Sequence, residues 1–221
     1  MESGDLGAGD SFGGYRSQLV EILRGKGITD LAVLKAVSEV PRHLFVPASV
    51  RHRAYEDSAL PIGQSQTISQ PFVQATYLQA LQLKGEEKVL EVGTGSGYQT
   101  ALLARLAAMV FSIERHASLA QQAKDTLTAA GVTNVSIMVG DGTLGWRPYA
   151  PYDAILVSAA SPDIPQPLLE QLSDGGRLVI PIGGRDTQRL IMVVRRGDEY
   201  IRHKLADVRF VPLVGELGYE E

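Results

Sequence analysis

A glycine-rich stretch at residues 88–100, KVLEVGTGSGYQT, has the residue types and spacing of a ligand-binding loop. Its apolar residues 89–92 predict a buried strand, and Gly93, Gly95 and Gly97 follow before a helical pattern begins. Glycine tolerates positive φ angles and allows the backbone to approach a ligand closely. The unpaired N–H groups of the following helical turn would then point at that ligand.

The spacing of these glycines and the acid that precedes them indicate the charge of the ligand. A dinucleotide-binding loop would carry its third glycine where this chain has Tyr98, so an NAD-dependent oxidoreductase is disfavoured. Glu91 would repel a pyrophosphate, whereas it suits the ammonium and sulfonium groups of a cofactor such as S-adenosylmethionine. The alternative is a glycine cluster that only turns the chain.

Three further candidate segments follow the ends of predicted strands. Glu114 ends the strand predicted at residues 109–113, where a carboxylate can hold a ribose diol, although it could also be a surface acid. Asp141 lies between two glycines after the strand at 135–139 and can accept a hydrogen bond from an adenine amino group. The small residues 158–160 follow the next strand and leave space for a substrate.

The elements that position these residues alternate between strand and helix from residue 88 to about 182. This pattern predicts an α/β fold with a doubly wound, mostly parallel sheet, and ligands of such sheets bind beyond the carboxyl ends of the strands. A helix is expected over residues 164–172, a tight turn at 174–176, and an antiparallel hairpin at 190–208.

The part of the chain before residue 88 predicts a helical extension. Helices are expected from Tyr15 to the glycines at 25–27, and after an N-cap pair at residues 29–30. Residues 41–47 lie between two prolines and predict an extended strap, and residues 55–67 predict a polar, turn-rich segment. Ser69 lies just before a helix that Pro71 begins, so it can be an N-cap, a site residue or both.

Length and composition bound the possible functions. The 221 residues, 44% hydrophobic, predict one domain over residues 15–221, with a disordered tail at 1–14, a covering segment at 15–87 and a Rossmann-like core at 88–221. The net charge of -4 argues against a nucleic-acid partner. The chain has no cysteine, and its four histidines are scattered, so no metal is expected. No signal peptide or membrane span is recognisable, so a cytoplasmic location is expected.

Several segments together resemble the protein-L-isoaspartate (D-aspartate) O-methyltransferase family from about residue 15 to the end. The TIS-P segment and the closing RFVPLVG are the most specific of them. The segments are PRHLFVP (41–47), LPIGQSQTISQP (60–71), VLEVGTGSGYQTALLA (89–104), VGDG (139–142), DAILVSAASPDIPQPLLEQL (153–172), GGRLVIPIG (175–183) and VRFVPLVG (208–215).

The resemblance implies a Rossmann-like class I methyltransferase that repairs aged proteins. S-adenosylmethionine would methylate the abnormal carboxylate of an isoaspartyl or D-aspartyl residue, the ester would collapse to a succinimide, and hydrolysis would return some normal aspartate. A carboxylate with a pKa near ~4 is already ionised at neutral pH, so no catalytic base is needed. Damaged proteins and peptides are then the expected partners, and a monomer is expected.

The resemblance also implies roles for individual residues, and Gln74 stands where some members of the family have His. The implied catalytic residue is Ser69. The implied cofactor-binding residues are Thr67, Ile68, Gln74, Glu91, Val92, Gly93, Thr94, Gly95, Ser96, Gly97, Glu114, Asp141 and Gly142. The implied substrate-binding residues are Thr67, Ile68, Ser69, Ser158, Ala159, Ala160, Val211, Leu213 and Val214.

Two other functions remain open from the sequence. One is an S-adenosylmethionine-dependent methyltransferase that acts on a small molecule or a nucleic acid, although the acidic balance fits nucleic acid poorly. The other is a catalytically silent module that binds the cofactor or peptide ends.

Overall fold

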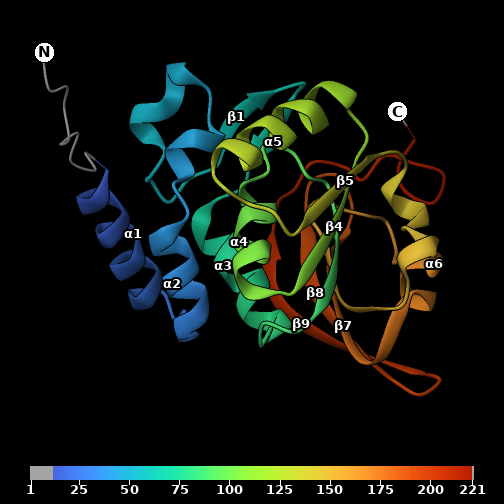
Figure 1. Ribbon diagram of the computed structural model, residues 1–221. Coiled ribbons are helices and arrows are strands. Elements are labelled where there is room, and N and C mark those ends of the chain that lie inside the picture. Colours follow the sequence, from blue (N-terminus) through green and yellow to red (C-terminus); the bar gives the residue numbers. More distant parts are fainter. Residues whose placement is uncertain (1–11, 221) are drawn as a thin grey trace, which may run out of the picture.

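The computed structural model describes residues 12–220, which form a central sheet with helices on both faces (Figure 1). Most of the tail expected at residues 1–14 lies outside the described residues, and the first helix already begins at Gly13. The strands are β1 (Leu60–Gly63), β2 (Gln66–Ile68), β3 (Lys88–Val92), β4 (Met109–Glu114), β5 (Val135–Val139), β6 (Tyr152–Val157), β7 (Leu172–Gly183), β8 (Gln188–Arg196) and β9 (Glu199–Val208). The α-helices are α1 (Gly13–Gly25), α2 (Leu31–Glu39), α3 (Pro71–Leu81), α4 (Tyr98–Leu106), α5 (Ala117–Ala129) and α6 (Gln166–Glu170), and the 3₁₀ helices are η1 (Arg42–Phe45), η2 (Ala48–Arg53), η3 (Gly142–Leu144) and η4 (Arg147–Tyr149).

The large sheet has seven strands in the order β5-β4-β3-β6-β7-β8-β9. The strands from β5 to β7 pair in parallel, and β8 and β9 add an antiparallel hairpin at one edge. The predicted fold class is therefore confirmed. The winding reverses beside β3, because β4 pairs with one side of it and β6 with the other. Such a reversal opens a crevice at the carboxyl ends of the strands.

Strand β3 carries apolar side chains at successive positions, Val89 and Leu90, because both faces of the sheet are covered. Val89 belongs to a core cluster beneath α2, α3 and α4, whereas Leu90 and Val92 belong to a second cluster on the opposite face. Parallel strands that are buried on both faces read as continuous apolar runs for this reason.

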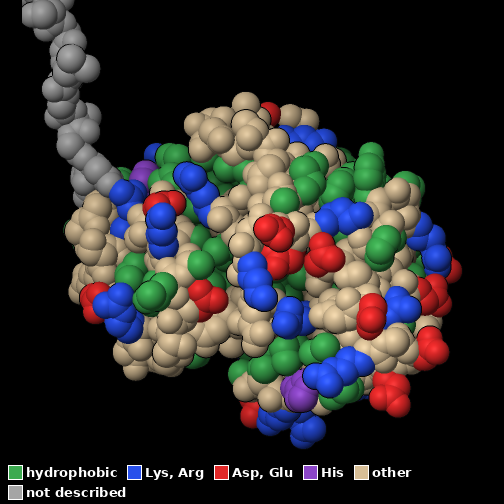
Figure 2. Space-filling view, turned by 60° about the horizontal axis from the view of Figure 1, so that its bottom comes forward, with side chains coloured by type: hydrophobic (Ala, Val, Ile, Leu, Met, Phe, Trp, Pro, Cys, Tyr) green, Lys and Arg blue, Asp and Glu red, His purple; other side chains and the backbone are tan. Residues whose placement is uncertain are grey.

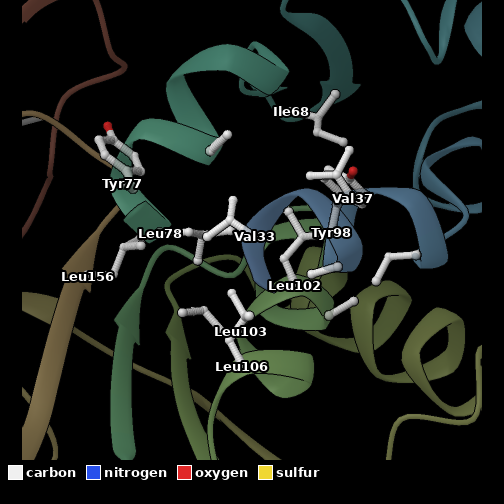
Figure 3. Packing of buried hydrophobic residues seen from close by; sticks show 14 of the residues in the cluster. Val33, Val37, Ile68, Tyr77, Leu78, Tyr98, Leu102, Leu103, Leu106 and Leu156 are labelled. Atoms are coloured by element: carbon white, nitrogen blue, oxygen red, sulfur yellow. The ribbon is translucent and has the colours of Figure 1, made fainter. Parts of the chain in front are cut away.

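The N-terminal helices form a further layer over the first face. Figure 3 shows Val33 of α2, Leu78 of α3 and Leu102 of α4 pointing into one cluster, and all three side chains are buried. Asp30 caps α2 by accepting hydrogen bonds from the backbone N–H groups of Ala32 and Val33, as the sequence predicts. The helical extension is thus packed onto the core of the sheet.

One expectation about the segments before α3 is wrong, and one element there was not predicted. Residues 42–45 form the 3₁₀ helix η1 instead of an extended strap, and the Leu44 N–H donates to the Pro41 carbonyl at 2.9 Å. The segment expected to be polar and turn-rich also contains the antiparallel hairpin β1–β2, in which Leu60 pairs with Ile68. Both of these residues are buried, so the hairpin is anchored by its apolar ends.

The C-terminal half also differs from expectation in detail. The predicted tight turn at residues 174–176 lies inside β7, which begins at Leu172 and shifts register against β6. Helix α6 is shorter than predicted, because Pro165 is its N-cap residue and the helix ends at Glu170. After the hairpin, Pro212 and Val214 form isolated bridges with Ala160 and Tyr219. Among the described residues, no helix is long and apolar enough to cross a membrane.

Asp57 fixes the start of α3, the helix that follows the candidate residue Ser69. Its Oδ1 accepts the Phe72 N–H at 2.8 Å, and its Oδ2 accepts Lys26 Nζ at 2.6 Å and Gln70 Nε2 at 3.1 Å. Burial by itself would raise the pKa of Asp57, but these hydrogen bonds outweigh it and lower the pKa below its usual value.

We expect Asp57→Ala to lower the free energy of unfolding by about 1–3 kcal/mol at pH 7, because one helix N–H and one ammonium lose their acceptor. The pKa of Asp57 is lower in the folded chain than in the unfolded chain. Its contribution to the free energy of unfolding is therefore present above about pH 4, and it is lost as the pH falls through the pKa of the folded chain. Urea unfolding at several pH values measures this, with the exposed Asp198→Ala as control. A deficit that stays constant down to pH 3 would contradict the assignment.

Candidate active site

One cavity lies at the reversal point of the sheet and collects most of the predicted site residues. Its walls come from β2 and α3, the glycine turn after β3, the ends of β4, β5 and β6, and the segment after β9. The predicted residues that line it are Thr67, Ile68, Ser69, Gln74, Val92, Gly93, Thr94, Gly95, Ser96, Glu114, Gly142, Ser158, Ala159, Val211, Leu213 and Val214. Glu91, Gly97, Asp141 and Ala160 do not line it.

The glycine turn requires glycine for its backbone conformation. Gly93, Gly95 and Gly97 have φ angles of +95°, +54° and +86°, which side chains disfavour. The hairpin also covers this turn, since a Cβ atom on Gly95 would lie 3.5 Å from Cδ1 of Ile62. The turn is therefore enclosed by the β1–β2 hairpin.

Glu114 is held in a fixed orientation at the end of β4. Its Oε2 accepts the Gly95 N–H at 2.8 Å, and its Oε1 accepts the His116 N–H at 3.0 Å. Each carboxylate oxygen can accept a further hydrogen bond, so Glu114 can still receive two hydroxyl groups from the cavity that it lines.

Glu91 lies behind the glycine turn, fully buried, instead of in the cavity wall. Its Oε2 accepts the hydroxyl groups of Thr100 at 2.5 Å and Ser112 at 2.7 Å. The Ser112 hydroxyl also lies 2.6 Å from that of Thr94, a residue of the turn. Burial raises the pKa of Glu91 to about 7, although the two hydroxyl hydrogen bonds oppose the shift. Glu91 thus acts on the cavity through the hydroxyl groups that shape the turn.

Asp141 connects the rim of the cavity to the C-terminal segment. Its Oδ1 accepts the Thr143 N–H at 2.8 Å, and its Oδ2 accepts the Glu216 N–H at 2.8 Å. Burial alone would raise the pKa of Asp141, but these hydrogen bonds hold it below its usual value. The neighbouring Gly142 has no room for a side chain, because a Cβ atom there would lie 2.3 Å from Cγ1 of Val92.

The two predicted substrate walls lie side by side. The Ala160 N–H donates to the Val211 carbonyl at 2.8 Å, and the Leu213 N–H donates to the Ala160 carbonyl at 2.7 Å. The segment after β9 is thereby bound next to the end of β6, and the bridge between Ala160 and Pro212 joins residues that are 52 positions apart in the chain.

Sequence reasoning missed part of the site. Most of the missed residues are immediate neighbours of predicted ones, so their place next to a motif was the available signal. They are Gln66, Gln99, Ile113, Arg115, His116, Gly140 and Pro212. Arg42 was also missed, and its guanidinium donates to the Ser69 carbonyl at 2.9 Å and to Gln74 Oε1 at 2.8 Å.

The donor set fits an organic cation better than a metal. Within residues 12–220, no group of three His, Asp or Glu side chains could hold a metal ion. The cavity instead offers backbone groups of a glycine turn, an oriented carboxylate on β4 and the hydroxyl of Ser69. This set can hold an adenosine-containing cofactor and orient a carboxylate beside it.

Comparisons with known proteins identify the same architecture. A family model described as protein-L-isoaspartate(D-aspartate) O-methyltransferase matches residues 15–218. A protein-L-isoaspartate O-methyltransferase of Dictyoglomus thermophilum is 54% identical over 206 residues, which are 93% of this chain and 94% of the relative. One of Syntrophus aciditrophicus is 53% identical over 214 residues, which are 95% of this chain and 98% of the relative.

Two solved structures resemble the fold closely. A protein-L-isoaspartate O-methyltransferase structure has a TM-score of 0.83 and 29% identity, and the match covers 92% of this chain and 67% of that one. A Plasmodium falciparum β-aspartate methyltransferase in complex with S-adenosyl-L-homocysteine has a TM-score of 0.79 and 25% identity, with coverage of 90% and 98%.

We expect Glu91→Gln to change how stability depends on pH. Because the pKa of Glu91 is raised on folding from about 4.3 to about 7, the wild-type chain loses stability as the pH rises between those values. The variant has no such proton to lose, so its free energy of unfolding relative to wild type should rise by roughly 3 kcal/mol across this range. Urea unfolding from pH 4 to 8 measures this, with the exposed Glu86→Gln as control, and parallel curves would refute it.

Proposed function

The chain belongs to the protein-L-isoaspartate(D-aspartate) O-methyltransferase family, and from this we propose that it initiates the repair of damaged proteins and peptides. It transfers the methyl group of S-adenosylmethionine to the free carboxylate of L-isoaspartyl, and D-aspartyl, residues. The methyl ester then loses methanol when a backbone nitrogen attacks it, and hydrolysis of the resulting succinimide returns part of the residue to normal aspartyl. The observation that carries this proposal is the family match together with one cavity that joins the glycine turn, Ser69 and the walls at 158–160 and 211–214.

The cofactor's place in the cavity follows from the oriented groups around it. When bound, S-adenosylmethionine supplies an activated methyl group on a sulfonium. We assign the ribose hydroxyls to Glu114, whose two oxygens are aligned by backbone N–H groups. The amino-acid end is assigned to the glycine turn from Val92 to Gly97, with Glu91 acting from behind it, and the adenine to the rim at Asp141 and Gly142.

The substrate carboxylate needs orientation and desolvation instead of activation. It is already ionised near neutral pH and is therefore its own nucleophile. Ser69 can donate its hydroxyl hydrogen to one carboxylate oxygen and leave the other to attack. Thr67 and Ile68 on the hairpin and Val211, Leu213 and Val214 after β9 exclude water from the two charges, which fade together in the transition state.

We further propose that residues 15–221 act as one catalytic unit, as a monomer in the cytoplasm and without a nucleic-acid partner. The net charge of -4 supports the last point. Figure 2 supports it as well, because acidic and basic side chains are interspersed over most of the face that it presents.

The proposed function predicts transfer to only one member of a matched peptide pair. The two peptides are identical except that one carries an isoaspartyl and the other a normal aspartyl linkage, and labelled S-adenosylmethionine is the donor. We expect a base-labile methyl ester on the isoaspartyl peptide alone. Equal transfer to both peptides, or transfer to neither while the cofactor still binds, would refute the proposal.

Ser69→Ala tests the assignment of the catalytic hydroxyl. We expect kcat to fall by about 10- to 100-fold, because a hydrogen bond to a charged group is lost, while the Kd of S-adenosylhomocysteine stays within about twofold. Steady-state kinetics and calorimetry measure the two quantities. Ser17→Ala, on the exposed surface of α1, is the control. A Ser69→Ala protein with wild-type turnover would refute the role.

A further inference from the structure

Arg42 is a fully buried cation that joins four segments next to the cavity. Its Nε donates to the Ala54 carbonyl at 2.8 Å, its Nη1 to Gln74 Oε1 at 2.8 Å and its Nη2 to the Ser69 carbonyl at 2.9 Å. The guanidinium also lies over the ring of Tyr98, 4.8 Å from its centroid. The side chain is 0% exposed, so these contacts replace water entirely.

Stability alone does not explain a guanidinium in this position. Burial lowers the pKa of Arg42 to about 10, although the charges of Tyr98 and Asp57 oppose the shift, and none of its hydrogen-bond acceptors that the structure describes is a carboxylate. A buried charge costs free energy, and an apolar side chain of similar volume is often as stable. A buried charged residue next to a cavity is therefore a candidate for a role in the function of that cavity.

The contact with Gln74 decides which end of that amide faces the cavity. Only the carbonyl oxygen of an amide can accept from the N–H of a guanidinium, because the amide nitrogen is itself a donor. Oε1 is therefore held towards Arg42, and Nε2 remains as the group of this amide that can donate to a ligand. Gln74 is 4% exposed and lines the cavity, so its N–H donors are directed at whatever binds there.

The contact with Ser69 fixes the second polar group of the same wall. Arg42 holds the Ser69 carbonyl at the junction between β2 and α3, and the Arg42 side chain comes from η1, 27 residues earlier in the chain. The planar guanidinium of Arg42 thus fixes two things: the position of the backbone that carries the Ser69 hydroxyl, and the orientation of the Gln74 amide. A lysine could not reproduce it, because an ammonium lacks the planar fork.

We propose that Arg42 is a positioning residue that aims the Gln74 amide N–H and the Ser69 hydroxyl at a carboxylate bound in the cavity. The inference rests on the proposed function, which supplies two carboxylates: the amino-acid end of the cofactor and the isoaspartyl group of the substrate. Gln74 binds one of them through Nε2, and Arg42 acts only through Gln74 and Ser69.

The Gln74→Glu variant separates this role from a structural one. The new carboxylate still accepts from Arg42, and as an ion pair, so the thermal unfolding midpoint should be unchanged or higher. Towards the cavity it presents an acceptor and a negative charge in place of a donor. We expect a loss of about 10- to 100-fold or more, either in the affinity for S-adenosylhomocysteine or in kcat/KM for the isoaspartyl peptide, and the affected quantity identifies which carboxylate Gln74 binds.

The Arg42→Lys variant tests whether the planar guanidinium, and not only its positive charge, is required. It keeps the charge but cannot serve three acceptors, and we expect kcat/KM to fall by about 10- to 100-fold in protein that remains folded by circular dichroism. Arg53→Lys is the matched control, because Arg53 is partly exposed and pairs with Glu56 at the surface. This control should stay within about twofold of wild type.

Three results would overturn the inference. They are a folded Arg42→Lys protein with wild-type kcat and KM, a Gln74→Glu protein with wild-type affinity and kcat/KM, and a Gln74→Glu protein whose unfolding midpoint falls sharply. If wild-type protein methylates neither peptide, the proposed function fails instead. The inference is then judged by S-adenosylhomocysteine affinity alone, measured by calorimetry.

Discussion

The reversal of strand winding beside β3 is the constraint on which the rest of the site depends. The chain leaves β3 towards β4 on one side, and the strand on its other side, β6, comes from later in the sequence. The loops after these strands diverge, and the space between them is the crevice that the cavity occupies. The backbone must turn out of β3 within the glycine segment to leave this space open, and Gly93, Gly95 and Gly97 adopt the positive φ angles that this turn needs.

Much of the site could be predicted because it follows from local patterns. An apolar run predicts a buried strand, and the carboxyl ends of parallel strands share one edge, so Glu114 and Ser158 could be brought to one cavity without coordinates. The prediction was less accurate for Glu91, because the alternation of side chains along a fully buried strand cannot be read from its composition. The Glu91 side chain points away from the cavity, and its carboxylate accepts hydrogen bonds from the hydroxyl groups of Thr100 and Ser112.

The parts that could not be predicted depend on contacts between distant segments. Arg42 stands in a proline-bounded stretch whose local pattern predicts an extended conformation, yet its side chain finds acceptors 12, 27 and 32 residues further along. The hairpin β1–β2 could not be predicted either. Its strands have four and three residues, which is too few for an alternation of apolar and polar residues to be recognised. Tertiary contacts decide the conformation of such short segments, and local propensity is overridden.

The distribution of charge around the cavity fits the two charges that the proposed reaction brings together. Glu91 and Glu114 lie on the side of the glycine turn, where a sulfonium and an ammonium would be bound, and Arg42 lies behind Ser69 and Gln74 on the opposite wall. A substrate carboxylate would therefore meet the donors of Ser69 and Gln74 with the Arg42 cation behind them, while the cofactor would meet the carboxylate of Glu114. Because Glu114 and Arg42 are held by fixed hydrogen bonds, these two groups do not have to reorganise as the two charges of the reactants disappear. The proposed nucleophile arrives already ionised, so the arrangement has to orient it and has no proton to remove from it.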